Sequence, residues 1–209
     1  MSLENKILFD ISPVISPRTA VFPGDTPFQQ EFLLKTADGA NLDLSFIKTT
    51  VHIGAHTDAP SHYHADGMTM EKRNLKLYLG AAQVIEVKPA GPRIRPQDLQ
   101  TDIKAPRVLF KTMSFPDPNK WNGDFTALSS ELIDFLAKKN VRLVGIDTPS
   151  VDPAEDASLE SHTAIFKHDM AVLEGITLND VPAGLYELIC LPLKIEGSDA
   201  SPVRAVLLK

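Results

Sequence analysis

The sequence has little cysteine: Cys190 is the only one among 209 residues. An intramolecular disulfide is therefore excluded. Because this residue lies in the apolar run LYELICLPLKI, we expect a buried and unreactive thiol. A reducing cytoplasm is the simplest location for such a chain.

Long apolar segments and clusters of positive charge are also missing. No run approaches the roughly 18 apolar residues of a membrane-spanning helix, so no such helix is expected. The N-terminal segment carries Glu4, Lys6 and Asp10 and does not resemble a signal peptide. The net charge is −6, from 21 Lys and Arg against 27 Asp and Glu. Without a basic cluster, nucleic-acid binding is not expected.

The composition is that of a globular protein, with 43% hydrophobic and 23% charged residues, and the length fits a single domain over residues 1–209. Helical periodicity is clearest over 129–140, with Ser129 as N-cap. Further helices are predicted over 159–170, at Pro96 and near Thr177. Segments of strand length, bounded by Pro, Gly or Asp, occur at 6–11, 42–53, 82–87, 107–111, 141–146, 186–193 and 203–208. This irregular order predicts a β-rich α/β domain with few helices, and argues against a doubly wound sheet.

Four of the six histidines lie in the stretch TTVHIGAHTDAPSHYHADG, residues 49–67. His52, Gly54, His56 and Asp58 alternate, so an extended chain would point them to one side. A straight strand would separate the two histidines by about 13 Å. That distance is too long for ligands that bind one ion at about 2.0–2.1 Å. We therefore predict a bend at Gly54 and a site for Zn²⁺ or a similar ion. His64, in the turn signal HADG, is expected to be solvated.

Further ligands must come from other parts of the chain, where His162 and His168 are the remaining histidines. Glu174 lies inside the apolar run AVLEGI, where an unpaired carboxylate would be costly. A metal ion or a salt bridge to Lys or Arg would each remove that cost. The motifs of serine hydrolases, P-loops, dinucleotide-binding folds and common metalloproteases are missing from the sequence.

The segment HIGAHTDAPSHY resembles the H-x-G-T/A-H-x-D-x-P-x-H signature of the metal-dependent cyclase/formamidase superfamily. Other segments are similar to those of bacterial kynurenine formamidases and follow in the same order: VFPGDTPF, GIDTPSVDP, LESHTAIF, VLEGITL and LYELICLPLKIEGSDASPVRAVLL. The resemblance implies a swivelling β/β/α domain of the cyclase-like type with a mixed sheet, usually a homodimer. It also implies hydrolysis of N-formyl-L-kynurenine to L-kynurenine and formate in tryptophan degradation.

The same resemblance implies two Zn²⁺ per subunit, with Mn²⁺ or Co²⁺ as alternatives. His62 matches the general acid/base. Phe22 matches an aromatic residue that contacts the substrate, which is tryptophan in many members. The aromatic half of the substrate needs an apolar wall, for which Tyr63 and then Trp121 are weaker candidates than Phe22. Trp121 is expected more readily to anchor its loop. The matching metal ligands are His52, His56 and Asp58 for the first ion, and Asp58 (as a bridge), His162 and Glu174 for the second.

Two other functions remain open. A relative with the same fold but another substrate, such as an isatin-hydrolase-like enzyme with a single manganese ion, would use a similar ligand set. A non-catalytic metal-binding protein would have a closed site and no free acid/base group, and His62 argues against it.

Overall fold

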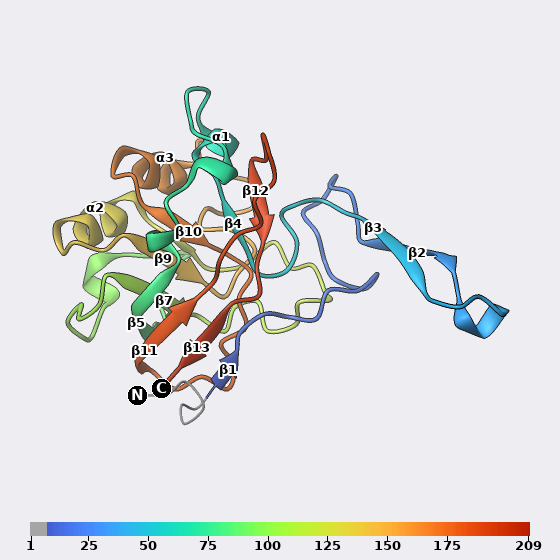
Figure 1. The fold of residues 1–209 in the computed structure, drawn as a ribbon. Helices are drawn as coiled ribbons and strands as arrows, with labels where there is room; N and C mark the ends of the chain where they lie inside the picture. The colour runs from blue at the N-terminus through green and yellow to red at the C-terminus, as the bar shows by residue number, and fades with distance from the viewer. Residues whose placement is uncertain (1–7) are drawn as a thin grey trace.

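The computed structural model describes residues 8–209, and its largest element is a seven-stranded mixed sheet (Figure 1). The spatial order is β1 (Leu8–Asp10), β13 (Val206–Leu208), β11 (Gly184–Ile189), β5 (Leu79–Glu86), β7 (Arg107–Lys111), β9 (Leu143–Ile146) and β10 (Ala171–Leu173). The four neighbouring strands β5, β7, β9 and β10 run parallel, and β1, β13 and β11 continue the sheet in antiparallel pairs.

Helices α2 (Ser130–Lys138) and α3 (Glu160–Lys167) lie beside each other on one side of this sheet (Figure 1). The Ser129 hydroxyl accepts a hydrogen bond from Leu132 N at 3.2 Å, which confirms the predicted N-cap. Successive residues of β7 point to opposite faces. Val108 and Phe110 therefore pack with the helices, and Leu109 packs in the core of the other face.

Short elements cover the other face and carry the histidine-rich segment. Strand β4 (His56–Asp58) pairs antiparallel with β12 (Ala200–Pro202), and α1 (Pro60–Tyr63) follows at once. Two further short strands, β6 (Arg93–Ile94) and β8 (Ala127–Leu128), lie on the helix side, where Ile94 and Leu128 are part of the core. The 3₁₀ turns are Thr36–Asp38, Met70–Lys72, Leu75–Leu77 and Pro96–Asp98.

A two-stranded hairpin projects from the body of the molecule (Figure 1). Its strands are β2 (Gln29–Leu34) and β3 (Leu44–Lys48), and every residue of both is exposed. The base of the hairpin is closed by a hydrogen bond from Thr50 N to Thr26 O at 3.0 Å. We refer to β2, β3 and their connecting turn as the arm.

Most predicted elements are confirmed, with corrections at a few boundaries. The predicted strand 42–53 is wrong in its second half: β3 ends at Lys48, and Gly54 turns the chain with a φ of 56°. No helix forms near Thr177, because its N–H donates to Ile11 O across the core. Strand 6–11 is β1, with residues 6 and 7 outside the described residues. Cys190 is buried, and burial raises the pKa of its thiol to about 12, as expected of an unreactive group.

Across residues 8–209, no helix combines the length and apolar character needed to cross a membrane.

Candidate metal centre

Two glycines allow the loops that carry the predicted ligands to approach each other. Gly54 bends the chain between His52 and His56, as predicted, and the ring centroids of these histidines lie 5.3 Å apart. Gly175 has a φ of 64°, and a Cβ there would lie 2.1 Å from Gly54 O. This close approach lets the backbones of His56 and Glu174 exchange hydrogen bonds of 3.1 and 2.9 Å. Glu174 is thereby placed beside the histidine motif although 118 positions separate it from His56 (174 − 56).

Each of three histidines has one ring nitrogen bonded to a group that can only accept. His52 Nε2 donates to Asp199 Oδ2 at 3.0 Å, and His56 Nδ1 donates to Gly54 O at 2.9 Å. His162 Nδ1 donates to an Asp152 oxygen at 2.8 Å. These bonds fix which nitrogen carries a proton in the neutral rings. The opposite nitrogens, His52 Nδ1, His56 Nε2 and His162 Nε2, are then free to act as metal ligands.

Those free nitrogens all face the carboxylates of Asp58 and Glu174. His52 Nδ1 and His56 Nε2 lie 3.0 and 3.6 Å from Asp58 Oδ1, and His162 Nε2 lies 3.4 Å from Asp58 Oδ2. Glu174 lies 3.3 Å from His56 Nε2 and 3.5 Å from His162 Nε2. Ligands at about 2.0–2.1 Å from a tetrahedral ion are separated by about 3.3–3.4 Å, so the spacing fits.

The two oxygens of Asp58 point to different groups of ligands. One group is formed by His52, His56 and Asp58, and the other by Asp58, His162 and Glu174. Within each group the ligand atoms lie within 4.8 Å of one another. Asp58 therefore contributes one oxygen to each group.

Burial supports the presence of a cation in this centre. Asp58 Oδ1 and His162 Nε2 are buried and have no partner in hydrogen-bonding geometry. Unpaired buried polar atoms are costly. Glu174 forms ion pairs with His56 and His162, so the alternative of a salt bridge to Lys or Arg is not what the described residues show. A divalent ion bound by imidazole and carboxylate would satisfy all these groups.

The histidines and carboxylates change each other's pKa values strongly. Burial lowers the pKa of His162, but the hydrogen bond to Asp152 and the contact with Asp58 outweigh it and raise the pKa to about 10. Burial opposes the rise at His52 as well, where Asp58 and Asp199 raise the pKa to about 9. Burial raises the pKa of Asp58, yet contacts with His162 and His52 hold it well below its usual range. A metal ion therefore competes with protons for this centre.

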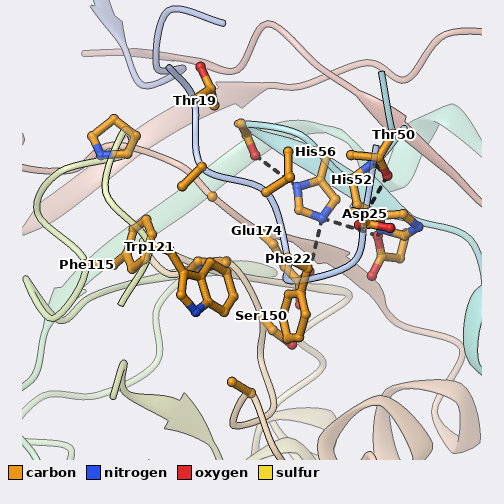
Figure 2. A pocket seen from close by; sticks show the side chains of 18 of the residues that line it. Thr19, Phe22, Asp25, Thr50, His52, His56, Phe115, Trp121, Ser150 and Glu174 are labelled. Atoms are coloured by element: carbon orange, nitrogen blue, oxygen red, sulfur yellow. Dashed lines mark hydrogen bonds and ion pairs between the residues drawn. The ribbon is translucent and has the colours of Figure 1, made fainter. Parts of the chain in front are cut away.

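The centre opens into a pocket of about 680 Å³. One side of the pocket is aromatic: Phe22, Phe115 and Trp121 lie together, and the rings of Phe22 and Trp121 are 4.8 Å apart (Figure 2). Phe22 thus lines the pocket, and Trp121 does so as well instead of serving only as a loop anchor. Tyr63 is not part of the lining and packs on His162, with ring centroids 4.9 Å apart.

His62 lies on α1 at the edge of the centre. Its ring centroid is 4.1 Å from that of His52, and its side chain is 36% exposed and lines the pocket. Its Nδ1 lies 3.4 Å from Asp199 Oδ2. The residue is therefore positioned to exchange protons with a molecule in the pocket.

Residues 9–153 match the family described as "Putative cyclase". The matched segment covers more than half of the chain and includes the motif from His52 to His62. The chain belongs to this cyclase family.

Solved structures agree with this assignment. One relative, described as a "potential metal-dependent hydrolase with cyclase activity", is 28% identical, with a TM-score of 0.83 over 97% of this chain and 98% of the other. A "predicted metal-dependent hydrolase" from Bacillus stearothermophilus is 25% identical, with a TM-score of 0.81 over 97% and 98%. An isatin hydrolase bound to thioisatinate is 20% identical, with a TM-score of 0.82 over 99% and 93%, and shows likeness of fold. The predicted cyclase-like fold is confirmed.

Two residues that complete the centre of this cyclase-family chain had no role predicted from the sequence. Asp152 and Asp199 each hold the second ring nitrogen of a histidine. Both occur in segments that resemble the formamidases, and an acid in such a segment is the signal that could have identified them. The two remaining histidines lie outside the centre: His64 is exposed, as expected, and His168 pairs with Asp134 at 2.6 Å.

Proposed function

We propose that this cyclase-family chain, a metal-dependent hydrolase, cleaves N-formyl-L-kynurenine to L-kynurenine and formate. The observation that carries the proposal is a cluster of three histidines and two carboxylates, buried except for the half-buried His52, that opens into a pocket with an aromatic wall. The two solved relatives described as metal-dependent hydrolases support the reaction class. The segments similar to kynurenine formamidases support the substrate.

We assign two ions, Zn²⁺ in the first instance, to the two groups that share Asp58. His52 and His56 complete the first group, and His162 and Glu174 complete the second. When bound, a pair of such ions polarises a carbonyl oxygen and lowers the pKa of bound water. The protein holds its ligands in fixed tautomers and excludes solvent from both carboxylates.

His62 is assigned the proton transfer. Hydrolysis forms a C–O bond from water to the formyl carbon and breaks the C–N bond to the aromatic amine. The water must lose a proton, and the departing nitrogen must gain one. A partly exposed imidazole at the pocket edge can carry out both steps, and its ion pair with Asp199 holds the ring in place.

The pocket lining suits the two halves of this substrate. The aromatic wall around Phe22 and Trp121 provides an apolar surface for the aryl ring. Across the described residues, the lining has six carboxylates and no Lys or Arg: Asp25, Asp58, Asp147, Asp156, Glu174 and Asp199. Asp58 and Glu174 are assigned to the ions, Asp199 contacts two histidines, and Asp156 contacts Arg93. Asp147 accepts hydrogen bonds from Thr112 N and Met113 N, so Asp25 is the carboxylate available to a positive group of the substrate. Asp25 lies in the same turn as Phe22, where its N–H donates to Phe22 O at 2.9 Å, and it lines the pocket near Thr50 and His52 (Figure 2). It is our candidate for contact with the α-ammonium group.

The test is a comparison of substrates on protein stripped by a chelator and titrated with zinc. We expect hydrolysis of N-formyl-L-kynurenine to return and to saturate near two ions per chain. Preferential hydrolysis of isatin would instead assign the chain to the alternative substrate class. Saturable zinc binding with no turnover of formanilides or cyclic amides would support the non-catalytic alternative.

We also propose that the chain acts as a homodimer, and the arm supports this. Its exposed apolar side chains are Phe32, Leu33, Leu34, Leu42, Leu44, Phe46 and Ile47. A lone two-stranded hairpin is marginally stable in water, and an apolar patch of this kind typically marks an interface. The body of the same chain exposes Leu191, Leu193 and Ile195, so two copies could cover each other's patches.

A further inference from the structure

Asp152 is a fully buried carboxylate, 0% exposed, that receives four N–H groups. Its Oδ1 accepts hydrogen bonds from Ser161 N at 2.9 Å and from Arg93 Nη1 at 2.8 Å. Its Oδ2 accepts from His162 N at 3.0 Å and from His162 Nδ1 at 2.8 Å. Two donors therefore converge on each oxygen.

This arrangement requires a carboxylate. An amide group in the same place would present an NH₂ group to one of the two donor pairs, because only one of its two terminal atoms can accept. The NH₂ group would then lie against the N–H groups of His162 or against those of Arg93 and Ser161. Because all of these groups are donors, buried N–H groups would be left unsatisfied.

Arg93 holds this carboxylate from the side away from the centre. Its guanidinium also donates to Leu128 O at 2.7 Å and pairs with Glu160 at 3.2 Å, and it contacts Asp156. The planar guanidinium thus links β6 to the start of α3, the helix that carries His162. Groups other than His162 therefore hold Oδ1 of Asp152, and Oδ2 is left for His162.

We propose that Asp152, anchored by Arg93, is a positioning residue that fixes the tautomer and orientation of His162 and thereby sets the metal affinity of one half of the centre. The inference rests on the two-ion arrangement of the proposed function. The other two histidine ligands are held differently: His56 by a backbone carbonyl, and His52 by Asp199, whose side chain is 50% exposed. A change at Asp152 should therefore weaken the group that contains His162 and spare the group that contains His52.

The experiment is a zinc titration of the Asp152→Asn protein by competition with a chromophoric chelator. Loss of a supporting hydrogen bond to a ligand histidine typically lowers metal affinity about 10–100-fold. We expect the affinity for one of the two zinc ions to fall by that factor and the affinity for the other to stay as in the wild type. The matched control is Glu160→Gln, which loses a contact to the same Arg93 without touching His162, and its two affinities should not change.

A second measurement separates positioning from general loss of structure. In the zinc-loaded wild type, the Nδ1–H of His162 should give a slowly exchanging downfield proton signal, and Asp152→Asn should lose it while the other protected signals remain. If that variant does not fold, Arg93→Lys keeps the charge but loses the planar fork. We expect Arg93→Lys to lower the affinity for the same zinc ion about 10-fold.

Unchanged zinc affinities in Asp152→Asn, or in Arg93→Lys where the former does not fold, would overturn the positioning role. An equal loss of affinity for both zinc ions would also overturn the positioning role. Because the readout is metal binding, failure of the zinc-loaded wild type to hydrolyse N-formyl-L-kynurenine would reject the substrate assignment and leave this result intact.

Discussion

Replacement of Gly175 by alanine should damage both the stability and the metal affinity of the protein. Gly175 has a φ of 64°, where an alanine residue costs about 1–2 kcal/mol. Its new Cβ would also lie 2.1 Å from Gly54 O. Real Cβ atoms essentially never come closer than 3.0 Å to such an atom, so one of the two loops must move by about 0.9 Å. Forcing extra atoms into a packed region typically adds about 1–3 kcal/mol.

The sum predicts that Gly175→Ala lowers the free energy of unfolding by about 2–5 kcal/mol. The same movement separates the backbones of His56 and Glu174, which carry ligands. It exceeds the roughly 0.5 Å within which a functional site must be held. We therefore expect zinc affinity to fall at least 10-fold.

Urea denaturation of the chelated protein and a zinc titration would measure the two effects. Gly39→Ala is the matched control: its φ is 90°, and a Cβ there would have no neighbour within 4 Å. The control should lose only the backbone contribution and keep its zinc affinity. If Gly175→Ala is no less stable than the control and binds zinc equally well, the reasoning about the close approach is refuted.

Four further predictions address the site and the arm. His62→Ala should retain zinc and lose about 10²–10⁴-fold in kcat, whereas Asp58→Ala should lose both zinc and activity, as metal analysis and turnover would show. Because the folded-state pKa of His162 is raised from 6.5 to about 10, its stabilising effect in chelated protein is full below pH 6.5. That stability should decline as pH rises towards 10, which denaturation across this range would measure. Asp25→Asn should raise KM for N-formyl-L-kynurenine but not for N-formylaniline, which lacks the ammonium group. Phe46→Glu should convert a dimer to a monomer in light scattering; a wild-type monomer would contradict the proposed use of the arm.

The fold was predictable where burial alone determines the local structure. Strand β7 has the predicted bounds because its apolar run is buried on both faces of the sheet. Of the two strands of the arm, β3 lies within the predicted strand 42–53, but β2 was not predicted. Strand β2 is exposed along its whole length, so its sequence has no buried face to indicate a strand. The error at 42–53 arose because the apolar and β-branched pattern continues past Lys48, whereas β3 ends there with its last pair, Lys48 and Gln29 of β2. The missing helix near Thr177 reflects a long-range hydrogen bond that no local pattern contains.

The centre was predictable to the extent that its ligands are close in sequence or in an unusual setting. His52, His56 and Asp58 lie in one short segment, and Glu174 stood out as an acid in an apolar run. Asp152 and Asp199 could not be assigned in this way, because each meets its histidine only after α3 or β12 has packed. Such supporting groups are set by tertiary contacts.

The pairing of β4 with β12 has a consequence for biosynthesis. His52 and its partner Asp199 are 147 residues apart in the chain, and β12 is among the last strands to be made. A nascent chain that has exposed only the histidine motif lacks both the neighbouring strand and the supporting carboxylate. The strand that pairs with β4 and the carboxylate that supports His52 can therefore join the centre only after residues 199–202 have left the ribosome. Chains that end after Glu174 and before Asp199 keep the metal ligands but lack the carboxylate that supports His52.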